Sequence, residues 1–400
     1  MSKKMLSQSF LLPELKILKV IPDKAHGKIM VCEKVSAFEV CPKCAQKATT
    51  VYDHVEINIK DQPIRNSAVT LRIRKRRFYC KSCKKPFREP VPGIMKGFRT
   101  SQRFRAHIRW CASNFSDLKR VAKHCRCSNW LIYKAYYEQI ELELRKVKNP
   151  WPKTIGIDEH SFVRNISKRT REFTTVFIDY TNRRMREAIL GKSLLDLNGP
   201  RITSIPGREN VKNVIMDLSP TFRSWAQDFF PGARIIADKF HVVKLIHPLV
   251  HEYRRQVIKE FELNGMRTNP ATRMLLRYHK RLRYHERSVL SKLLDLSADL
   301  KEIYWFEQRI YAFYRIKGFN KAREVFIQML DDMAYSKLKG IQTLRNTLKR
   351  WFNQILNYFK TKLTNGRTEG YNRKAKLIQR CAYGFRNYEN YRLKLLYSCR

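Results

Sequence analysis

The sequence has 400 residues, enough for two to four domains with hydrophobic cores of their own. Its 82 lysines and arginines exceed its 35 acidic residues, and the formal charge of +47 is too large for an ordinary soluble enzyme without a polyanionic partner. The hydrophobic content of 43% excludes a basic disordered tail.

The partner that this charge predicts is nucleic acid, and binding would then depend strongly on salt. An anionic membrane surface is the alternative, but the sequence holds no apolar run long enough to span a bilayer. The N-terminus lacks the apolar segment of a secretory signal, so we expect a cytoplasmic protein. Its ten cysteines are then not expected to form disulfides.

Two Cys-x-x-Cys pairs, Cys41/Cys44 and Cys80/Cys83, lie in the N-terminal quarter of the chain. Between them, residues 68–79 alternate apolar and basic side chains, which predicts a β-strand with one cationic face. Four thiolates at these spacings can close a tetrahedral site around one Zn²⁺ per chain. The pattern therefore predicts a zinc ribbon, with a redox pair or a chance arrangement as the alternative.

The basic side chains of that strand are candidates for binding DNA. They would lie on a rigid unit held by a metal, which suits contacts to the phosphate backbone. The candidate residues are Arg72, Arg74, Lys75, Arg76 and Arg77.

A helical pattern extends over residues 101–143. Within it, residues 116–123 have the pattern of a capped first helix, residues 125–128 that of a turn, and Asn129–Gln139 that of a second helix with Ser128 as its N-cap. This spacing predicts a helix-turn-helix whose second helix enters a major groove, and a plain helical hairpin is the alternative. The candidate DNA contacts of this region are Arg120, Lys123 and Lys134.

Two groups of histidine and cysteine residues could suggest further metal sites. His124, Cys125 and Cys127 match no common zinc spacing, so we interpret them as structural residues. His247 and His251 are four residues apart but lack a glutamate in the zincin position, and we interpret them in the same way.

The segment Thr154–Val163 is predicted to begin with a buried strand that ends on a carboxylate. Ile155 and Ile157 are apolar and β-branched, and Gly156 between them allows another part of the chain to come close. Asp158 follows directly. A charged carboxylate at that depth is costly unless it is paired or binds a metal.

Four more strands are predicted over residues 172–180, 184–190, 211–216 and 234–238. Asp217 follows the third of these directly, and two strand-end aspartates in one sheet would begin a metal site. The first three strands of the region should be antiparallel, after which strand and helix alternate. That order is how an RNase H-like sheet begins.

Residues from about 241 to 360 are helical, basic and rich in aromatic side chains. Interleaved cations and rings suit single strands or distorted duplex ends, on which bases can stack. The alternative is a helical domain with a packed core and a solvated basic face.

The last segment places Glu369 in the first turn of a helix that begins near Thr368. Asn372 and Lys376 follow three and seven residues later, on the same face of that helix. An acid and a cation on one face could hold a metal and a phosphate together. A surface ion pair is the alternative.

Several stretches of the sequence resemble the DDE transposases of bacterial insertion sequences, in particular the ISL3 branch. The matching stretches are Ile155–Phe162, Val214–Ser219, Phe230–Ala233 with Ala237–Lys244, and Asn365–Asn387. The double Cys-x-x-Cys pattern and the helix-turn-helix spacing fit the same family. The resemblance implies an α/β RNase H-like core interrupted by an all-α insertion, in a bacterial, nucleoid-associated protein.

The resemblance also implies a catalytic triad, which by position is Asp158, Asp217 and Glu369. Asp238 also ends a strand and is the rival to Asp217, which we prefer because its strand lies beside the first in this fold. Residues 191–206 depart from the family pattern. The supporting positions close to the site are Asp238, His241, Asn372 and Lys376.

The chemistry that the resemblance implies is phosphoryl transfer. Three carboxylates can hold two Mg²⁺ or Mn²⁺ ions about 4 Å apart, which activate a water or a 3′-hydroxyl and stabilise the leaving oxygen. The same site could hydrolyse a transposon end and join it to target DNA. Lys376 and neighbouring cations such as Arg373 would contact the scissile phosphate.

The expected partner is double-stranded DNA, as terminal inverted repeats and as target, bound by a homodimer because two ends must be joined. An RNase H-like nuclease or resolvase without strand transfer is one alternative. A transposase-derived DNA-binding regulator without catalysis is another.

Breaks in composition, together with the resemblance, imply five segments. They are a zinc ribbon at 1–92, a helix-turn-helix at 93–149, the first part of the catalytic core at 150–242, a helical insertion at 243–360 and the helix with the last acid at 361–400.

Overall fold

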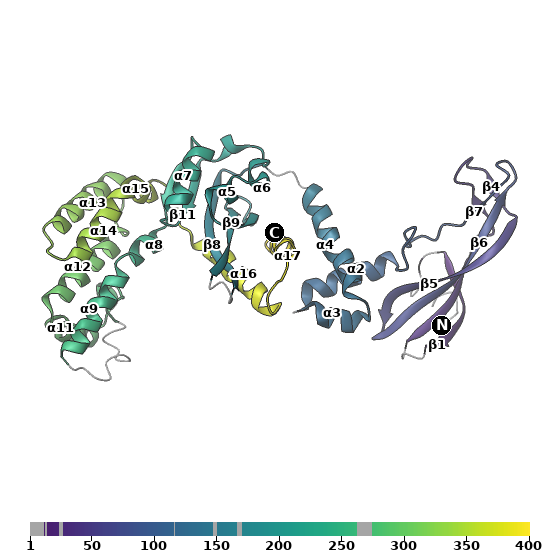
Figure 1. Cartoon of the computed structure of the whole chain (residues 1–400), viewed down its shortest axis with the longest axis horizontal. Helices are drawn as coiled ribbons and strands as arrows, with labels where there is room; N and C mark the ends of the chain where they lie inside the picture. The colour runs from purple at the N-terminus through teal and green to yellow at the C-terminus, as the bar shows by residue number, and fades with distance from the viewer. Residues whose placement is uncertain are drawn as a thin grey trace. The chain divides into compact units, whose positions relative to one another are not determined.

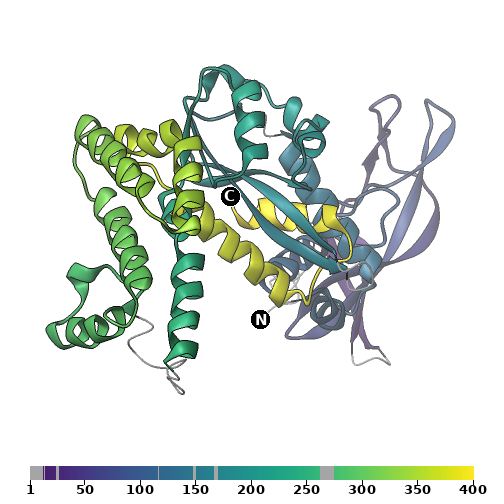
Figure 2. The ribbon, with the colours of Figure 1, turned by 60° about the vertical axis from the view of Figure 1, so that its left-hand side comes forward.

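The computed structural model describes residues 12, 14–23, 27–115, 117–146, 150–165, 170–261 and 274–400. The chain divides into two compact units, which Figures 1 and 2 show in two views. One unit comprises Met1–Val147 and Gln379–Lys394, and the other comprises Lys148–Ile378 and Leu395–Arg400. In the described part of the chain, every helix is too short or too polar to cross a lipid bilayer.

The first unit begins with a sheet in which β1, β2, β6 and β5 are neighbours in that order and β7 pairs with β6. The long antiparallel hairpin of β5 and β6 turns at Arg65 and Asn66, whose positive φ angles of 50° and 61° fit a two-residue hairpin loop. Alternate residues of β6 are buried, among them Leu71 and Ile73. The strands are β1 (Leu15–Pro22), β2 (Lys28–Lys34), β5 (Val51–Ile64), β6 (Ser67–Cys80) and β7 (Lys85–Arg88).

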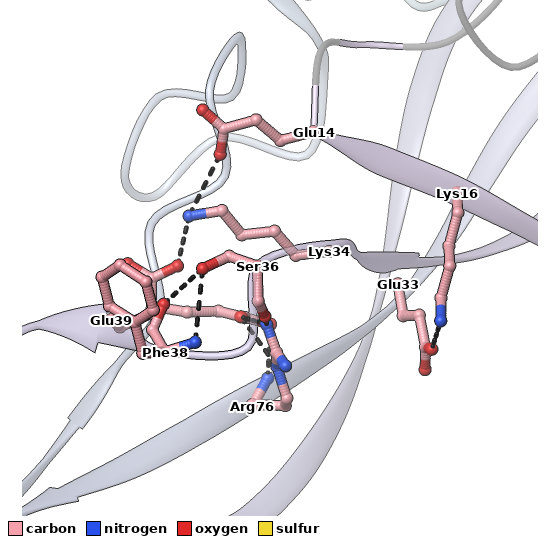
Figure 3. Close-up of polar contacts among 9 residues, drawn as sticks. Glu14, Lys16, Glu33, Lys34, Ser36, Phe38, Glu39 and Arg76 are labelled. Carbon is pink, nitrogen blue, oxygen red and sulfur yellow. Dashed lines mark hydrogen bonds and ion pairs between the residues drawn. The ribbon is translucent and has the colours of Figure 1, made fainter. Parts of the chain in front are cut away.

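A small second sheet of β3 (Glu39–Val40) and β4 (Lys47–Ala48) follows β2. Polar contacts hold the segment between β2 and β3, as Figure 3 shows. Lys34 forms an ion pair with Glu39, and the Arg76 guanidinium donates to the Ser36 carbonyl at 2.7 Å. The beginning of the ribbon is thereby fixed to β6.

Three helices complete the N-terminal part of this unit: α2 (Gln102–Asn114), α3 (Leu118–Cys125) and α4 (Asn129–Lys146). Each begins at a side chain that accepts from the first turn of its own helix. The caps are Ser101, Asp117 and Ser128, so the predicted cap at Ser128 is confirmed. Arg126, at φ 47°, ends α3 in the left-handed conformation and turns the chain toward α4.

The second unit is built on a five-stranded sheet in the order β10-β9-β8-β11-β12. Strands β8, β9 and β10 are antiparallel, and β11 and β12 run parallel to β8. The predicted order of three antiparallel strands before an alternation of strand and helix is therefore confirmed. The strands are β8 (Thr154–Asn165), β9 (Thr170–Asp179), β10 (Arg184–Leu190), β11 (Asn213–Met216) and β12 (Arg234–Ala237).

The two faces of this sheet are covered by different helices. Val214 and Met216 of β11 pack in one apolar cluster with α7 (Pro220–Phe229), whose N-cap is Ser219. Ile215, between them, packs in the other cluster, with the helices that follow β12. The segment between β10 and β11 forms three short elements: α5 (Leu194–Leu197), α6 (Pro200–Thr203) and η1 (Arg208–Asn210).

All regular structure described between β12 and Thr361 is helical. Some aromatic side chains of this region form the core, such as Tyr304 and Phe313, whereas Tyr284 and Tyr335 are largely exposed. The helices are α8 (Lys239–Lys244), α9 (His247–Glu260), η2 (His279–Arg281), α11 (Tyr284–Leu294), α12 (Ala298–Phe313), α13 (Phe319–Ala334), α14 (Lys339–Arg350) and α15 (Phe352–Thr361). The chain ends with α16 (Gly366–Cys381) and α17 (Tyr388–Ser398).

Candidate active site and zinc ribbon

The register of the second sheet brings three aspartates to one level. Ile215 pairs with Gly156 and Met216 pairs with Ala237. When both registers are continued by one or two residues, Asp217 lies between Asp158 and Asp238 on neighbouring strands, which are about 4.8 Å apart.

The expectation that the first strand ends on Asp158 is wrong, because β8 continues to Asn165. Strand β11 pairs with β8 only as far as Gly156, whereas β9 pairs with β8 along its whole length. Beyond Gly156 one edge of β8 is therefore open toward Asp217. This open edge, rather than a strand end, lets Asp158 leave the apolar layer.

Asp158 is largely buried and accepts two hydrogen bonds. Its own neighbour Glu159 donates from the backbone at 2.8 Å, and the side-chain amide of Asn372 donates at 2.8 Å. Burial raises the pKa of Asp158 to about 6, and the charges of Asp217 and Asp238 act in the same direction. Neighbouring carboxylates with raised pKa values, such as Asp158 and Asp217, are typical of functional sites, including those that bind a cation.

Asp217 follows β11 and accepts from the backbone of Ser219 at 3.2 Å. Burial raises the pKa of Asp217 above its usual value, and the charge of Glu159 adds to this effect. Glu159 itself forms an ion pair with Lys192 at 2.9 Å. No local sequence pattern singles out this ion pair, which lies beside the two aspartates.

Asp238 is 2% exposed, and both of its carboxylate oxygens are engaged. One accepts from the backbone of Asn365 at 3.0 Å, and the other contacts the Nδ1 atom of His241 at 3.0 Å. This hydrogen bond raises the pKa of His241. Asp238 thus joins β12 to the beginning of α16, where its negative charge favours the helix N-terminus.

Helix α16 reaches Asp158 through Asn372, which also lies 3.1 Å from the Nδ1 atom of His160. Glu369, one turn earlier, is exposed and forms an ion pair with Arg373 at 2.8 Å. Lys376 is exposed, and its charge acts on His160.

The structure therefore brings together Asp158, Asp217, Asp238 and His241, with Asn372 beside Asp158, but pairs Glu369 elsewhere. Among the described residues, the three predicted acids do not form a group whose ligand atoms all lie within 4.8 Å of one another. His160 was not predicted, although it lies two residues after Asp158 on the same strand and therefore on the same face.

The four cysteines of the predicted ribbon lie together. The Sγ atoms of Cys41 and Cys83 are 3.9 Å apart and those of Cys44 and Cys80 are 3.5 Å apart. Tetrahedral Zn–S bonds of about 2.3 Å require S···S distances of about 3.8 Å. Backbone N–H groups of Cys44 and Lys43 lower the pKa of the Cys41 thiol to about 6, which favours the thiolate that a metal needs.

Two of the basic residues predicted to bind DNA from β6 are engaged within the unit. Arg76 pairs with the buried Glu89 at 2.8 Å, and Arg77 pairs with Asp53. Arg74 is exposed, as the alternation predicts.

On the helices, Arg120 and Lys123 of α3 are exposed. Lys134 of α4 lies over the ring of Trp130 at 4.6 Å, and that ring is 64% exposed.

Comparison with known protein families shows which family has this combination of domains. Residues 155–395, more than half of the chain, match the ISL3 family model described as "Transposase". The chain belongs to the ISL3 family of transposases. Residues 37–83 match the "zinc-finger of transposase IS204/IS1001/IS1096/IS1165", so both the family resemblance and the zinc ribbon are confirmed.

A curated relative supports the assignment over nearly the whole length. The "Transposase for insertion sequence element IS1001" of Bordetella parapertussis is 23% identical over 386 residues, covering 93% of this chain and 89% of the relative. The family match of this ISL3 transposase includes the mixed sheet, the three aspartates and helix α16.

Proposed function

We propose that this transposase binds the terminal inverted repeats of an insertion sequence and catalyses metal-dependent DNA cleavage and strand transfer. Its catalytic residues would be Asp158, Asp217 and Glu369. The observation that carries the proposal is the common register of Asp158 and Asp217, which sets two partly buried carboxylates with raised pKa values beside each other at the open edge of β8.

The residues at this edge fit a divalent metal. Carboxylate oxygens are the ligands that Mg²⁺ and Mn²⁺ prefer, and a bound cation would remove the cost of ionising two buried acids. When bound, such ions supply an activated water or 3′-hydroxyl and neutralise the leaving oxygen. Asp158 and Asp217 would hold them, and Glu369 would complete the site.

Glu369 can join the site at small cost. Its ion pair with Arg373 is solvent-exposed, with side chains 52% and 78% exposed, and such pairs contribute only about 0–1 kcal/mol. Asn372, three residues later on the same helix face, already contacts Asp158. A change of the Glu369 rotamer would therefore bring its carboxylate toward Asp158 and release Arg373 for a DNA phosphate.

The remaining polar residues would position these groups. Asn372 holds Asp158 and is itself held by His160, while Asp238 fixes the beginning of α16 and orients His241. Lys376, exposed on α16, would contact the phosphate that is cut.

We propose that the second unit is an RNase H-like core. Its support is the strand order, three antiparallel strands followed by two parallel ones, with an all-α insertion between β12 and α16. The predicted boundaries of the core and the insertion, 150–242, 243–360 and 361–400, remain part of this proposal, as do the ribbon at 1–92 and the helix-turn-helix at 93–149.

The zinc ribbon and the helices α3 and α4 would bind the inverted repeats. The exposed cations Arg74, Arg120 and Lys123 would contact phosphates, and Trp130 with Lys134 would lie at the beginning of the recognition helix. Since two transposon ends must be joined, we propose a homodimer on DNA in the bacterial cytoplasm, associated with the nucleoid.

The test is incubation of the purified full-length protein with Mg²⁺ and a duplex that carries a transposon end. Cleavage together with a joined product supports the proposal. Cleavage without joining would indicate a nuclease or resolvase, and a gel shift without cleavage would indicate a DNA-binding regulator. Asp217→Asn should abolish cleavage and keep DNA binding, whereas Asp228→Asn, at an exposed position of α7, should change neither.

A further inference from the structure

A second group of metal-ligating side chains lies in the first unit, outside the zinc ribbon. His107 and Cys111 are four residues apart on one face of α2, and Cys125 is the last residue of α3. The Nε2 atom of His107 and the Sγ atoms of both cysteines all lie within 4.8 Å of one another.

The distances within this group fit one metal ion. His107 Nε2 and Cys111 Sγ are 3.5 Å apart. A tetrahedral ion with a Zn–N bond of about 2.05 Å and a Zn–S bond of about 2.3 Å requires an N···S distance of about 3.6 Å. The same geometric test applied to the ribbon cysteines, which belong to a recognised zinc finger, gives 3.5 and 3.9 Å between sulfurs.

Cys127 is the candidate for a fourth ligand. Its thiol interacts with that of Cys125, but its Sγ atom does not lie within 4.8 Å of all three other ligand atoms in this structure. The left-handed conformation of Arg126 and the hydrogen bond from Cys127 N to Ala122 O return the chain toward the end of α3. The thiols of Cys125 and Cys127 therefore lie beside each other at the end of α3.

Packing alone does not explain the arrangement. Cys32 and Cys399 show how this chain buries a cysteine for packing, each with no second cysteine close to it in the sequence or among the described metal-ligating groups. Here two thiols and an imidazole converge, with the Cys127 thiol beside that of Cys125, and Cys111 and Cys125 are 0% and 4% exposed. Lys60, whose Nζ atom donates to Arg126 O at 3.1 Å, places a positive charge beside thiolates.

We propose that His107, Cys111, Cys125 and Cys127 bind a second structural Zn²⁺. Three soft thiolates and one imidazole in a tetrahedral arrangement select this ion. The metal would join α2 to the end of α3 and so fix the turn from which α4 begins at Asn129. Such a site would replace our interpretation of Cys125 and Cys127 as structural residues, which considered only the local spacing and not the two ligands from α2.

Metal content of the full-length protein tests the proposal. Purified with zinc and freed of loosely bound metal, the protein should hold two zinc ions per chain, one in the ribbon and one here. Cys127→Ser, at a half-buried position, should reduce the content to one and lower the melting temperature. Cys32→Ser, a matched change of a buried thiol outside both groups, should leave two.

Cobalt substitution provides a second measurement that does not depend on the stability of one variant. A ribbon variant, Cys44→Ser with Cys83→Ser, should still bind one Co²⁺ per chain with the visible absorption of a tetrahedral thiolate–imidazole site, and His107→Ala in that background should abolish it. A single zinc per wild-type chain, unchanged by Cys127→Ser, would overturn the proposal. So would a disulfide between these cysteines in protein isolated under reducing conditions.

Discussion

The environment of Asp158 disfavours its charge when no metal is bound. Its pKa of about 6 lies roughly two units above the usual 3.8, so ionising it above pH 7 costs about 2–3 kcal/mol of folding free energy. We expect Asp158→Asn to abolish cleavage and yet to keep or raise the melting temperature of the metal-free protein at pH 7.5. A clear loss of stability would show that the charge is satisfied within the protein. Asp228→Asn is the matched control.

The same group predicts how metal binding depends on pH. The pKa of Asp158 is raised, so the protonated form favours folding and this contribution is lost as the pH rises from about 4 to about 6. Below pH 6 a divalent cation must displace the proton of Asp158, whereas above pH 6 the Asp158 carboxylate is already ionised. Thermal stabilisation by Mn²⁺ should therefore be large at pH 7.5 and small at pH 5.0. Equal shifts at both values would exclude Asp158 as a ligand.

Asp238 and Asp217 should differ in the kind of effect that their loss produces. Asp238 is buried and fixes the backbone of Asn365, so Asp238→Ala should cost about 1–3 kcal/mol of stability by leaving that N–H unpaired. Asp217→Asn should change the stability little but abolish cleavage. Chemical denaturation and cleavage assays on both variants separate the roles. If Asp238→Asn alone abolished cleavage of a stable protein, the second catalytic acid would be Asp238.

At the scale of elements, the position of α16 depends on Gly156 in β8. A Cβ atom at residue 156 would lie 2.3 Å from the Thr368 hydroxyl oxygen and 2.6 Å from the Tyr180 ring. Gly156→Ala should therefore displace the beginning of α16 and cost about 1–3 kcal/mol. Thermal unfolding is the measurement.

Two further variants test the cause of that loss. Thr368→Ala in the Gly156→Ala background should restore part of the stability if the clash is responsible. Gly370→Ala, on the same helix with open space around its Cβ position, should be neutral or stabilising. A loss at Gly370 as large as that at Gly156 would contradict the assignment.

Much of the strand pattern could be predicted from the sequence, because it depends on neighbouring residues. The strand of residues 184–190 was predicted at its observed bounds. The five strands were also predicted in their order along the chain, three antiparallel strands followed by two that alternate with helices. The continuation of β8 beyond Asp158 was missed, since Glu159 and Ser161 interrupt the apolar pattern while β9 still pairs with them.

The candidate site shows where such prediction stops. The amide of Asn372 bonds to Asp158 across 214 residues of sequence, and no local pattern indicates that contact. The helix face of Glu369, Asn372 and Lys376 was predicted, but which of its members touches the sheet depends on how Asp238 and Gly156 seat α16. The second cysteine group was missed for the same reason, because its ligands come from two helices.

At the scale of the whole molecule, the net charge of +47 would govern the proposed binding to DNA. If the protein contacts six to ten phosphates, its affinity for duplex DNA should fall by about 10³–10⁵ between 50 and 200 mM salt. Removal of one phosphate contact, as in Lys123→Ala, should reduce the slope of log K against log salt by about 1. An affinity that hardly changes with salt would exclude this mode of binding.

The polypeptide passes from one unit to the other more than once. After the second unit begins at Lys148, residues Gln379–Lys394 return to the first, where the Lys394 ammonium donates to Ala112 O at 2.6 Å, and Leu395–Arg400 then rejoin the second. Neither unit can be released by a single proteolytic cut with all its own residues. A nascent chain would accordingly hold an incomplete first unit until residues 379–394 have been made, which would delay the proposed DNA-binding surface until after the proposed catalytic residues.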